Sequence, residues 1–264
     1  MGKESLYRAW LEAVQEHSFS KAEKLYHQII ELYPHCKEVN FPMGVWYKEK
    51  GLNEKALDAL RRALITDPEI AAEIYYYLGN VSRNMGNLLE AIDYFEQSIK
   101  EDPNFFEAHY NLGKIYSMLK NSEKALKEYK KALNLNPGDV DTYVNIGVEF
   151  SNLGKSKEAI KMYEKALEFE PQSYLIYSNL GVEYTALGEY EKAIEFHKKA
   201  LTLNTFYGDA WYNLACTYAL ANDVENSLKA LERAIKLDED NIEYAKKDPE
   251  LDNVKHTEEY KRLI

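Results

Sequence analysis

The sequence predicts an all-α fold of the α-solenoid type, in which helical units stack on one another. The main observation is a period of 34 residues, which separates Pro103, Pro137 and Pro171. The same shift relates Gly113 to Gly147. Self-similarity at a fixed period indicates stacked units that each bury one face against a neighbour.

Each period contains two runs of apolar residues at helical spacing. In the segment 106–139 these runs are separated by the polar residues Lys120, Asn121 and Ser122, and they comprise Leu112, Ile115, Tyr116 and Leu119, followed by Ala125, Tyr129, Ala132 and Leu133. Two amphipathic helices joined by a tight turn form a helical hairpin. We expect Ser122, and Ser156 one period later, to cap the second helix.

The hairpin repeats along nearly the whole chain. Outward from segment 106–139 we predict a seven-unit array over residues 3–241, with units at 3–36, 37–70, 72–105, 106–139, 140–173, 174–207 and 208–241. Residues 242–264 follow as a C-terminal capping helix and tail.

Proline and glycine mark fixed places in the unit. Prolines end the second helices because proline cannot continue the hydrogen-bond ladder; they are Pro34, Pro68, Pro103, Pro137 and Pro171. Four glycines favour a left-handed turn between the two helices: Gly51, Gly86, Gly154 and Gly188.

A second set of glycines lies inside the first helices, where glycine costs about 1 kcal/mol relative to alanine. These are Gly44, Gly79, Gly113, Gly147 and Gly181. Close approach of the two helices would offset that cost. We expect the facing small residues to be Ala56, Ala91, Ala125, Ala159 and Ala193.

The terminal units depart from the pattern. Trp10 stands where later units have glycine, and Thr205 and Glu239 replace the closing proline. Pro42 falls within the first helix of the second unit, so we expect that helix to start late, near Asn40, with the proline in its first turn.

The tail predicts a third helix after Glu239, a break at Asp248 and Pro249, and a short helix that Thr257 caps. Its spaced apolar residues are typical of a segment that seals the end of a repeat array. The alternative is that the tail folds back into the array as a self-ligand.

This combined pattern resembles the tetratricopeptide repeat (TPR) family over roughly residues 3 to 241. The resemblance rests on the 34-residue period, the aromatic-x-x-Leu-Gly-x-x-Tyr string, the later alanine, aromatic and alanine, and the closing proline. It implies a right-handed superhelix of antiparallel helix pairs, in which the first helices line a concave groove.

Composition limits the class of partner. The net charge of −11 and the pI near 5.2 argue against nucleic acid, whose binding depends on Lys and Arg. No apolar run or amino-terminal apolar core suggests a membrane span or signal peptide, so we expect a cytoplasmic protein without a membrane partner. Cys36 and Cys216 lie too many repeats apart to pair and are expected to be free thiols.

The sequence contains no recognisable catalytic constellation. The histidines show no metal-ligand spacing, and no glycine-rich phosphate loop or nucleophile elbow is present. His109 and His197 occupy aromatic places of their repeats, where packing is the expected role. We therefore predict a non-enzyme without a cofactor or metal.

The remaining candidate site is the concave groove. We number the places in each unit from its first residue, which is Phe106 in the unit 106–139. The sixth place carries a ladder of asparagines at 34-residue intervals: Asn111, Asn145, Asn179 and Asn213. A primary amide can donate to and accept from a peptide backbone at once, so the ladder predicts binding of an extended peptide. It resembles the asparagine ladder in the TPR regions of O-GlcNAc transferase and kinesin light chain. The alternative is that asparagine is simply frequent at this place in such repeats.

Neighbouring residues suggest the character of the groove. We assign its walls to the aromatic Tyr77, Tyr110 and Tyr212 and the apolar Val144, Val148 and Val182. Acids at the second place, such as Glu107 and Asp141, favour a ligand with basic residues. Chaperone-binding TPR domains hold the terminal carboxylate of a ligand in a site called a carboxylate clamp. Such a site is disfavoured here, because Tyr76 replaces the lysine expected before Asn80.

The predicted function is a non-catalytic protein–protein interaction adaptor that binds an extended peptide segment. Two alternatives stay open at this point. In the first, self-association fills the groove of one copy with the first repeat or the tail of another. In the second, the chain is a regulatory subunit of an enzyme assembled in trans.

Overall fold

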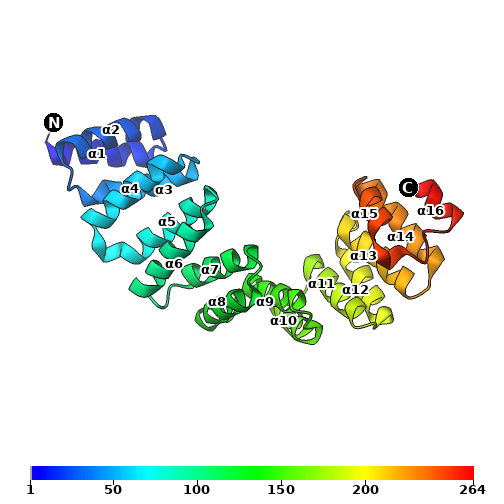
Figure 1. The fold of residues 1–264 in the computed structure, drawn as a ribbon. Coiled ribbons are helices and arrows are strands. Elements are labelled where there is room, and N and C mark those ends of the chain that lie inside the picture. The colour runs from blue at the N-terminus through cyan, green and yellow to red at the C-terminus, as the bar shows by residue number, and fades with distance from the viewer. Residues whose placement is uncertain (1) are drawn as a thin grey trace. The chain divides into compact units, whose positions relative to one another are not determined.

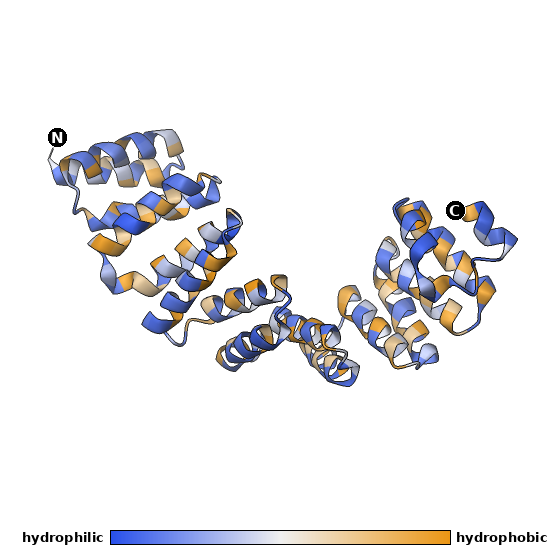
Figure 2. Cartoon of the chain, in the orientation of Figure 1, coloured by the Kyte–Doolittle hydropathy of each residue, from blue (hydrophilic) through white to orange (hydrophobic). Residues whose placement is uncertain are grey.

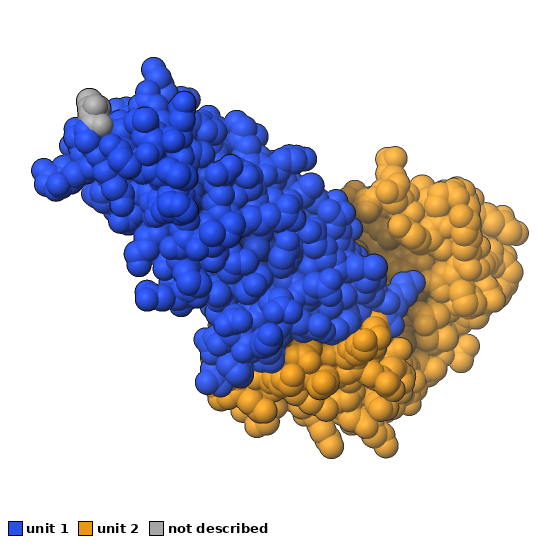
Figure 3. Space-filling model, turned by 60° about the vertical axis from the view of Figure 1, so that its left-hand side comes forward, with its two compact units in different colours: residues 1–120 blue, residues 121–264 orange. Residues whose placement is uncertain are grey.

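Figure 1 shows the computed structural model of the chain, which describes residues 2–264. All regular secondary structure in this range is helical, and the helices follow one another in packed pairs. The predicted all-α solenoid is confirmed. The chain divides into two compact units, Met1–Lys120 and Asn121–Ile264, coloured separately in Figure 3.

The first compact unit contains seven α-helices and one 3₁₀ helix in its described residues. In chain order they are α1 (Lys3–Gln15), α2 (Phe19–Leu32), α3 (Lys37–Glu49), α4 (Asn53–Thr66), η1 (Pro68–Ile70), α5 (Ala71–Asn84), α6 (Leu88–Glu101) and α7 (Phe106–Met118). Helices α1 and α2, α3 and α4, and α5 and α6 form hairpins, and each second helix packs on the first helix that follows it.

The second compact unit continues the alternation and ends in the tail. Its elements are α8 (Ser122–Leu135), α9 (Val140–Asn152), α10 (Ser156–Phe169), α11 (Tyr174–Ala186), α12 (Tyr190–Leu203), α13 (Gly208–Leu220), α14 (Val224–Leu237), α15 (Asn241–Lys247), η2 (Pro249–Leu251) and α16 (Glu258–Leu263). Helices α9 and α10, α11 and α12, and α13 and α14 form its hairpins.

Each compact unit has its own apolar core, and Figure 2 shows apolar residues alternating with polar ones along the helices. Large side chains fill the interiors, among them Tyr26 and Tyr47 in the first unit and Tyr163 in the second. In the part of the chain that is described, no helix combines the length and the apolar character that crossing a bilayer requires.

The turn inside each hairpin requires one residue in the left-handed conformation. The four predicted glycines adopt it, with φ between 69° at Gly154 and 81° at Gly86. Units without the glycine place His17, Lys120 or Asn222 there, with φ of 53°, 56° and 61°. The hairpin geometry therefore imposes the conformation, and glycine adopts it without steric cost.

The glycines inside the first helices accommodate a large side chain of the second helix. An ideal Cβ at Gly147 would lie 2.5 Å from Cε1 of Tyr163, and one at Gly79 would lie 2.8 Å from Cε1 of Phe95. The alanines expected to face these glycines are not the residues nearest to them. The nearest side chains lie one helical turn later, because a ring needs the volume that a missing Cβ leaves.

We predict that Gly147→Ala lowers the free energy of unfolding by about 1–3 kcal/mol, measured by urea denaturation. Displacing the buried Tyr163 ring outweighs the gain in helix propensity of about 1 kcal/mol. Gly138→Ala is the matched control, because a Cβ there would lie 3.8 Å from Phe169. Equal losses in the two variants would contradict this account.

The second helices end in the same register with or without proline. Each predicted proline stands two residues after the last helical residue, as Pro137 does after Leu135. Helices α12 and α14 stop equivalently without proline. There the side chains of Asn204 and Asp238 accept hydrogen bonds from the backbone N–H two residues later, at 3.1 and 2.9 Å. Such Asx turns end a helix locally.

The expected late start of the second unit is wrong. Helix α3 begins five residues before Pro42 and continues through it. Its first turn is anchored by the buried Asn40, whose amide donates to the carbonyl of Cys36 and to Oγ1 of Thr66, both at 3.2 Å. Pro42 itself is exposed, so its ring requires no space in the core.

The expected helix caps are displaced by one residue. Ser122 and Ser156 are the first helical residues of α8 and α10, and the N-caps are Asn121 and Lys155. Oδ1 of Asn121 accepts the backbone N–H of Lys124 at 3.2 Å. The amide of Asn121 thus performs the capping expected of the serine hydroxyl.

Candidate functional site

The predicted asparagines of the second compact unit stand at equivalent places on its first helices. Asn145, Asn179 and Asn213 are each half-buried, on α9, α11 and α13. The side-chain amides of Asn179 and Asn213 have no hydrogen-bond partner within residues 2–264. Both side chains are partly exposed, so water can bind the polar atoms that have no partner in the protein. These two amides are available to a ligand.

A hollow of about 760 Å³ brings three of the predicted residues together: Asn179, Tyr212 and Asn213. Residues of α13 and its preceding loop, including Tyr207 and Asp209, line it as well. The tail contributes the remaining wall through α15 and the segment that follows, among them Tyr244, Lys247 and Asp248.

A smaller hollow of about 140 Å³ adjoins this one at Asn213. It contains Val182, which is predicted as a wall residue and is 39% exposed. Val144 and Val148 are half-buried on α9, and neither they nor Asn145 line either hollow. Four of the seven peptide-binding residues predicted in this unit therefore line one of the two hollows.

The predicted residues of the first compact unit have a different environment. The amide of Asn111 donates to the carbonyl of Glu107 and accepts from Nη1 of Arg83, both at 2.8 Å. These contacts use one donor and one acceptor site of the Asn111 amide. A peptide contact at Asn111 would therefore have to share the amide with Arg83 and Glu107.

The aromatic residues predicted in this unit lie within small ring clusters. Tyr77 packs edge-on against Phe41, with ring centroids 5.3 Å apart, and Lys48 Nζ lies 5.5 Å above its ring. Burial, with the neighbouring Tyr76 as a smaller cause, raises the pKa of Tyr77. Tyr110 stacks on Phe106 with centroids 5.9 Å apart.

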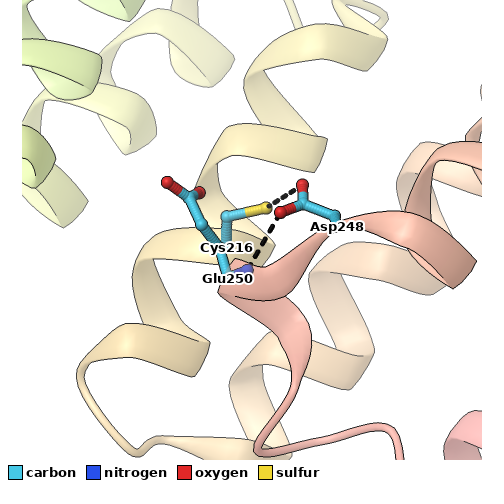
Figure 4. A group of neighbouring side chains, drawn as sticks. All are labelled: Cys216, Asp248 and Glu250. Atoms are coloured by element: carbon cyan, nitrogen blue, oxygen red, sulfur yellow. Dashed lines mark hydrogen bonds between the residues drawn. The ribbon is translucent and has the colours of Figure 1, made fainter.

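The tail contributes a feature that sequence reasoning missed. Oδ2 of Asp248 accepts a hydrogen bond from the hydroxyl of Tyr212 at 2.8 Å and from the thiol of Cys216 at 3.6 Å. Its Oδ1 accepts the backbone N–H of Glu250 at 3.0 Å (Figure 4). The sequence indicates a break in the helix at Asp248 and Pro249. It contains no local pattern that indicates hydrogen bonds from Tyr212 and Cys216 of α13 to Asp248.

Figure 4 shows Cys216 between the carboxylates of Asp248 and Glu250, with one ligand atom of each residue within 4.8 Å of the others. Such a group could in principle hold a metal. Burial, with the Asp248 charge as the next cause, raises the pKa of the Cys216 thiol, so it keeps its proton and donates to Asp248. Hydrogen bonding to Asp248 accounts for the arrangement, and we call Tyr212, Cys216 and Asp248 the latch.

The tail beyond the latch is packed into the core. Leu251 and Val254 are fully buried, and Tyr260 is nearly so. Thr257 caps α16 by accepting the N–H of Tyr260 at 3.2 Å, as predicted. This packing is that of a cap on α13 and α14.

Removing the Asp248 carboxylate should lower the free energy of unfolding by about 2–3 kcal/mol, because three donors lose an acceptor. Tyr212→Phe removes one of them and should cost about 1.5 kcal/mol. Denaturation of Asp248→Ala and Tyr212→Phe tests this. Asp252→Ala is the control, since within residues 2–264 the Asp252 side chain forms only a surface pair with Lys255. Losses no larger than that of the control would contradict the latch.

His197 borders the smaller hollow and is fully buried, with both ring nitrogens unpaired among the described residues. The packing role predicted for it is confirmed. Its polar edge lies against Gly181, where an ideal Cβ would come within 2.6 Å of both ring nitrogens. Burial lowers the pKa of His197 from 6.5 to about 4.

This shift predicts a pH dependence of stability. Below pH 6.5 the unfolded imidazole binds a proton while the folded one stays neutral, until the pH reaches the folded pKa of about 4. The free energy of unfolding should therefore fall by about 1.4 kcal/mol per pH unit across that window, and not above it.

Urea denaturation across the window measures the effect. His197→Phe should lack this component of the pH dependence, because phenylalanine preserves a ring against Gly181 without a titrating group. All other titrating residues are shared by the two proteins. Superimposable pH profiles would show that His197 contributes nothing.

Comparison with protein-family models finds matches to the tetratricopeptide repeat. They cover residues 72–105, 106–139, 140–173, 174–205 and 208–241, which is more than half of the chain. No curated protein sequence matches this chain.

Several solved structures are similar. MamA protein is 26% identical over 64% of this chain and 92% of its own, with a TM-score of 0.60. The C-terminal part of a TPR repeat-containing protein from Cytophaga hutchinsonii is 15% identical over 90% and 98%, with a TM-score of 0.76. YrrB, described as a TPR protein with an unusual peptide-binding site, is 22% identical over 73% and 100%, with a TM-score of 0.61. The last two similarities concern the fold alone.

Proposed function

The chain belongs to the tetratricopeptide repeat family of protein-interaction scaffolds, and we propose that it is a non-catalytic adaptor that binds an extended peptide segment of a partner. Seven units over residues 3–241, closed by the tail 242–264, form the array in this proposal. The first helices supply the binding face, and the second compact unit carries the main contacts.

The observation that carries the proposal is the pair of available amides at Asn179 and Asn213. They occupy equivalent places on neighbouring first helices, and both line the larger hollow. An extended peptide presents backbone N–H and C=O groups that two primary amides can satisfy without reading side chains. Tyr212 lies beside Asn213 and offers an aromatic wall.

Charge supports a ligand that contains basic residues. The two hollows are lined by four acids, Asp209, Glu243, Asp248 and Glu250, and by one base, Lys247. Among the described residues only Glu243 of these acids forms an ion pair, with Lys246. Unpaired carboxylates beside a binding surface attract cations and disfavour anionic partners. Both the acidic wall and the net charge of −11 disfavour nucleic acid.

The ladder is tested with a linear peptide selected on the full chain from a displayed random library. We expect Asn179→Ala with Asn213→Ala to weaken binding of that peptide at least about tenfold by fluorescence anisotropy. Hydrogen bonds of about 1 kcal/mol each, lost at two amides, suffice for this factor. The melting temperature should hardly change.

Asn134→Ala is the control for this test, because Asn134 is exposed on α8 and makes no recorded side-chain contact in the described structure. Unchanged affinity in the double variant would refute the ladder. A collapse of its thermal stability would instead assign the asparagines a structural role.

The packing of the tail bears on the self-association alternative. Exchange of tails between copies would have to release the latch and expose Leu251 and Val254. Burial of such side chains is worth about 2 kcal/mol each. A monomer in analytical centrifugation is therefore the expected state, and concentration-dependent growth would favour the assembling scaffold.

A further inference from the structure

A third hollow, of about 550 Å³, is lined by residues of α12, α13 and α14 and shares no residue with the two hollows described above. Helix α13 packs against both of the other helices. The lining residues recur at helical spacing, as Lys198, Leu201 and Thr202 do on α12, so one face of each helix turns toward the hollow. We call it the basic groove, after its exposed bases Lys198, Lys229 and Arg233.

The charge of the basic groove is opposite to that of the chain. Three bases and no acid line it among the described residues, whereas the whole chain has a net charge of −11. Lys229 pairs with Glu225. Lys198 and Arg233 form neither an ion pair nor a side-chain hydrogen bond within residues 2–264. Two cations at one hollow without an anionic partner favour a ligand that carries carboxylates.

The preceding hairpin fills the equivalent space with a side chain of its own. Phe196 of α12 stacks on Tyr177 and Tyr184 of α11, with ring centroids 6.2 and 5.2 Å apart. A cation completes this cluster, because Lys199 Nζ lies 4.2 Å from the centroid of the Tyr177 ring. Two rings of the first helix thus receive a third ring and a cation from the second helix.

The last hairpin keeps the two aromatic places, as Trp211 and Tyr218, but has Ala230 in place of the third ring. All three residues line the basic groove. The cation is kept as well, since the Arg233 guanidinium lies 5.8 Å from the centroid of the Trp211 ring. The ring that α14 lacks leaves room at this place for one from outside the chain.

We infer that the basic groove is a second binding surface, which takes an acidic segment of a partner protein that contains an aromatic residue. The aromatic ring packs against Trp211, and the flanking carboxylates pair with Lys198 and Arg233. Trp211 is half-buried, and its Nε1 donates to the carbonyl of Thr205 at 2.9 Å, which fixes the orientation of the indole. Guanidinium and ammonium groups bind carboxylates through charge-assisted hydrogen bonds.

The two unpaired cations cover the aromatic rings in the unbound chain. Lys198 Nζ lies 5.6 Å from the centroid of the Tyr218 ring, at a distance similar to that of Arg233 from Trp211. Such cation–π contacts are weak at exposed sites. A partner's aromatic side chain can therefore replace the cations at the rings, while their charged groups turn to its carboxylates.

The probe for this surface is the capped pentapeptide Asp-Asp-Phe-Asp-Asp, titrated into the isotope-labelled full chain. The indole N–H resonance of Trp211 reports binding, and those of Trp10 and Trp46, in the first compact unit, are internal references. We expect a saturable shift at Trp211 alone. The same peptide with alanine at its centre should bind at least about tenfold more weakly, because it lacks the ring.

Two double variants of equal charge change separate the local charge from the general one. Lys198→Gln with Arg233→Gln should weaken binding of the probe at least about tenfold, because both carboxylate partners are lost. Lys157→Gln with Lys161→Gln is the matched control. Both of these lysines are exposed on α10 and form no ion pair within the described residues, so this variant should bind as the unchanged protein does.

Ala230→Phe tests the space without changing the charge. It supplies the ring that Phe196 supplies in the preceding hairpin, so it should abolish the shift of Trp211 with the probe. The melting temperature should not fall, because the equivalent ring of α12 packs between two aromatic side chains. Probe binding that is unaffected by Ala230→Phe would show that the ring does not enter this space.

Absence of a saturable shift at Trp211 would overturn the second surface, as would equal weakening by the two charge variants. A short oligothymidylate that binds more tightly than the probe would assign the groove to nucleic acid and overturn the acidic segment. None of these outcomes bears on the ladder, whose test changes Asn179 and Asn213 and uses a different peptide. Each of the two binding surfaces can therefore fail alone.

Discussion

The close approach of the two helices of each hairpin is the constraint on which the rest of the structure depends. A first-helix glycine leaves room for the large side chain that the second helix inserts, as Tyr163 does at Gly147 and Phe95 at Gly79. This contact fixes the rotation of both helices about their axes. Because the same contact recurs in the successive hairpins of each compact unit, equivalent residues of the first helices within that unit face the same way.

The repeated orientation explains why a ladder can exist and why its members differ. Asn111 and Asn213 hold the same place in their units, yet the amide of Asn111 already bonds Arg83 and the carbonyl of Glu107. The amides of Asn179 and Asn213 remain available beside the larger hollow. The neighbouring first helix therefore decides whether the asparagine at this place of the repeat is already hydrogen-bonded.

The tail converts the open end of the array into part of the candidate site. Its apolar residues cap α13 and α14, and the latch holds Asp248 against Tyr212 and Cys216. Closing the core in this way also brings Glu250 to the smaller hollow. Stability of the last hairpin and the acidity of the groove thus depend on the same segment.

The sequence by itself determined the helical repeat, the hairpin turns, the register of the helix ends and the break at Pro249. These features follow from local rules of periodicity, backbone conformation and hydrogen bonding, which act within one unit. The same local rules misplaced the start of α3, because the contacts of Asn40 with Cys36, Tyr26 and Thr66 hold its first turn despite Pro42.

Only the tertiary structure decided which asparagines are available, where His197 lies and which residues of α13 meet Asp248. These are contacts between residues more than ten positions apart in the chain, such as Asp248 with Tyr212 and His197 with Gly181. Periodicity records which face a residue occupies, whereas the identity of its neighbour depends on how successive units stack. The chemistry of the site arises from that stacking.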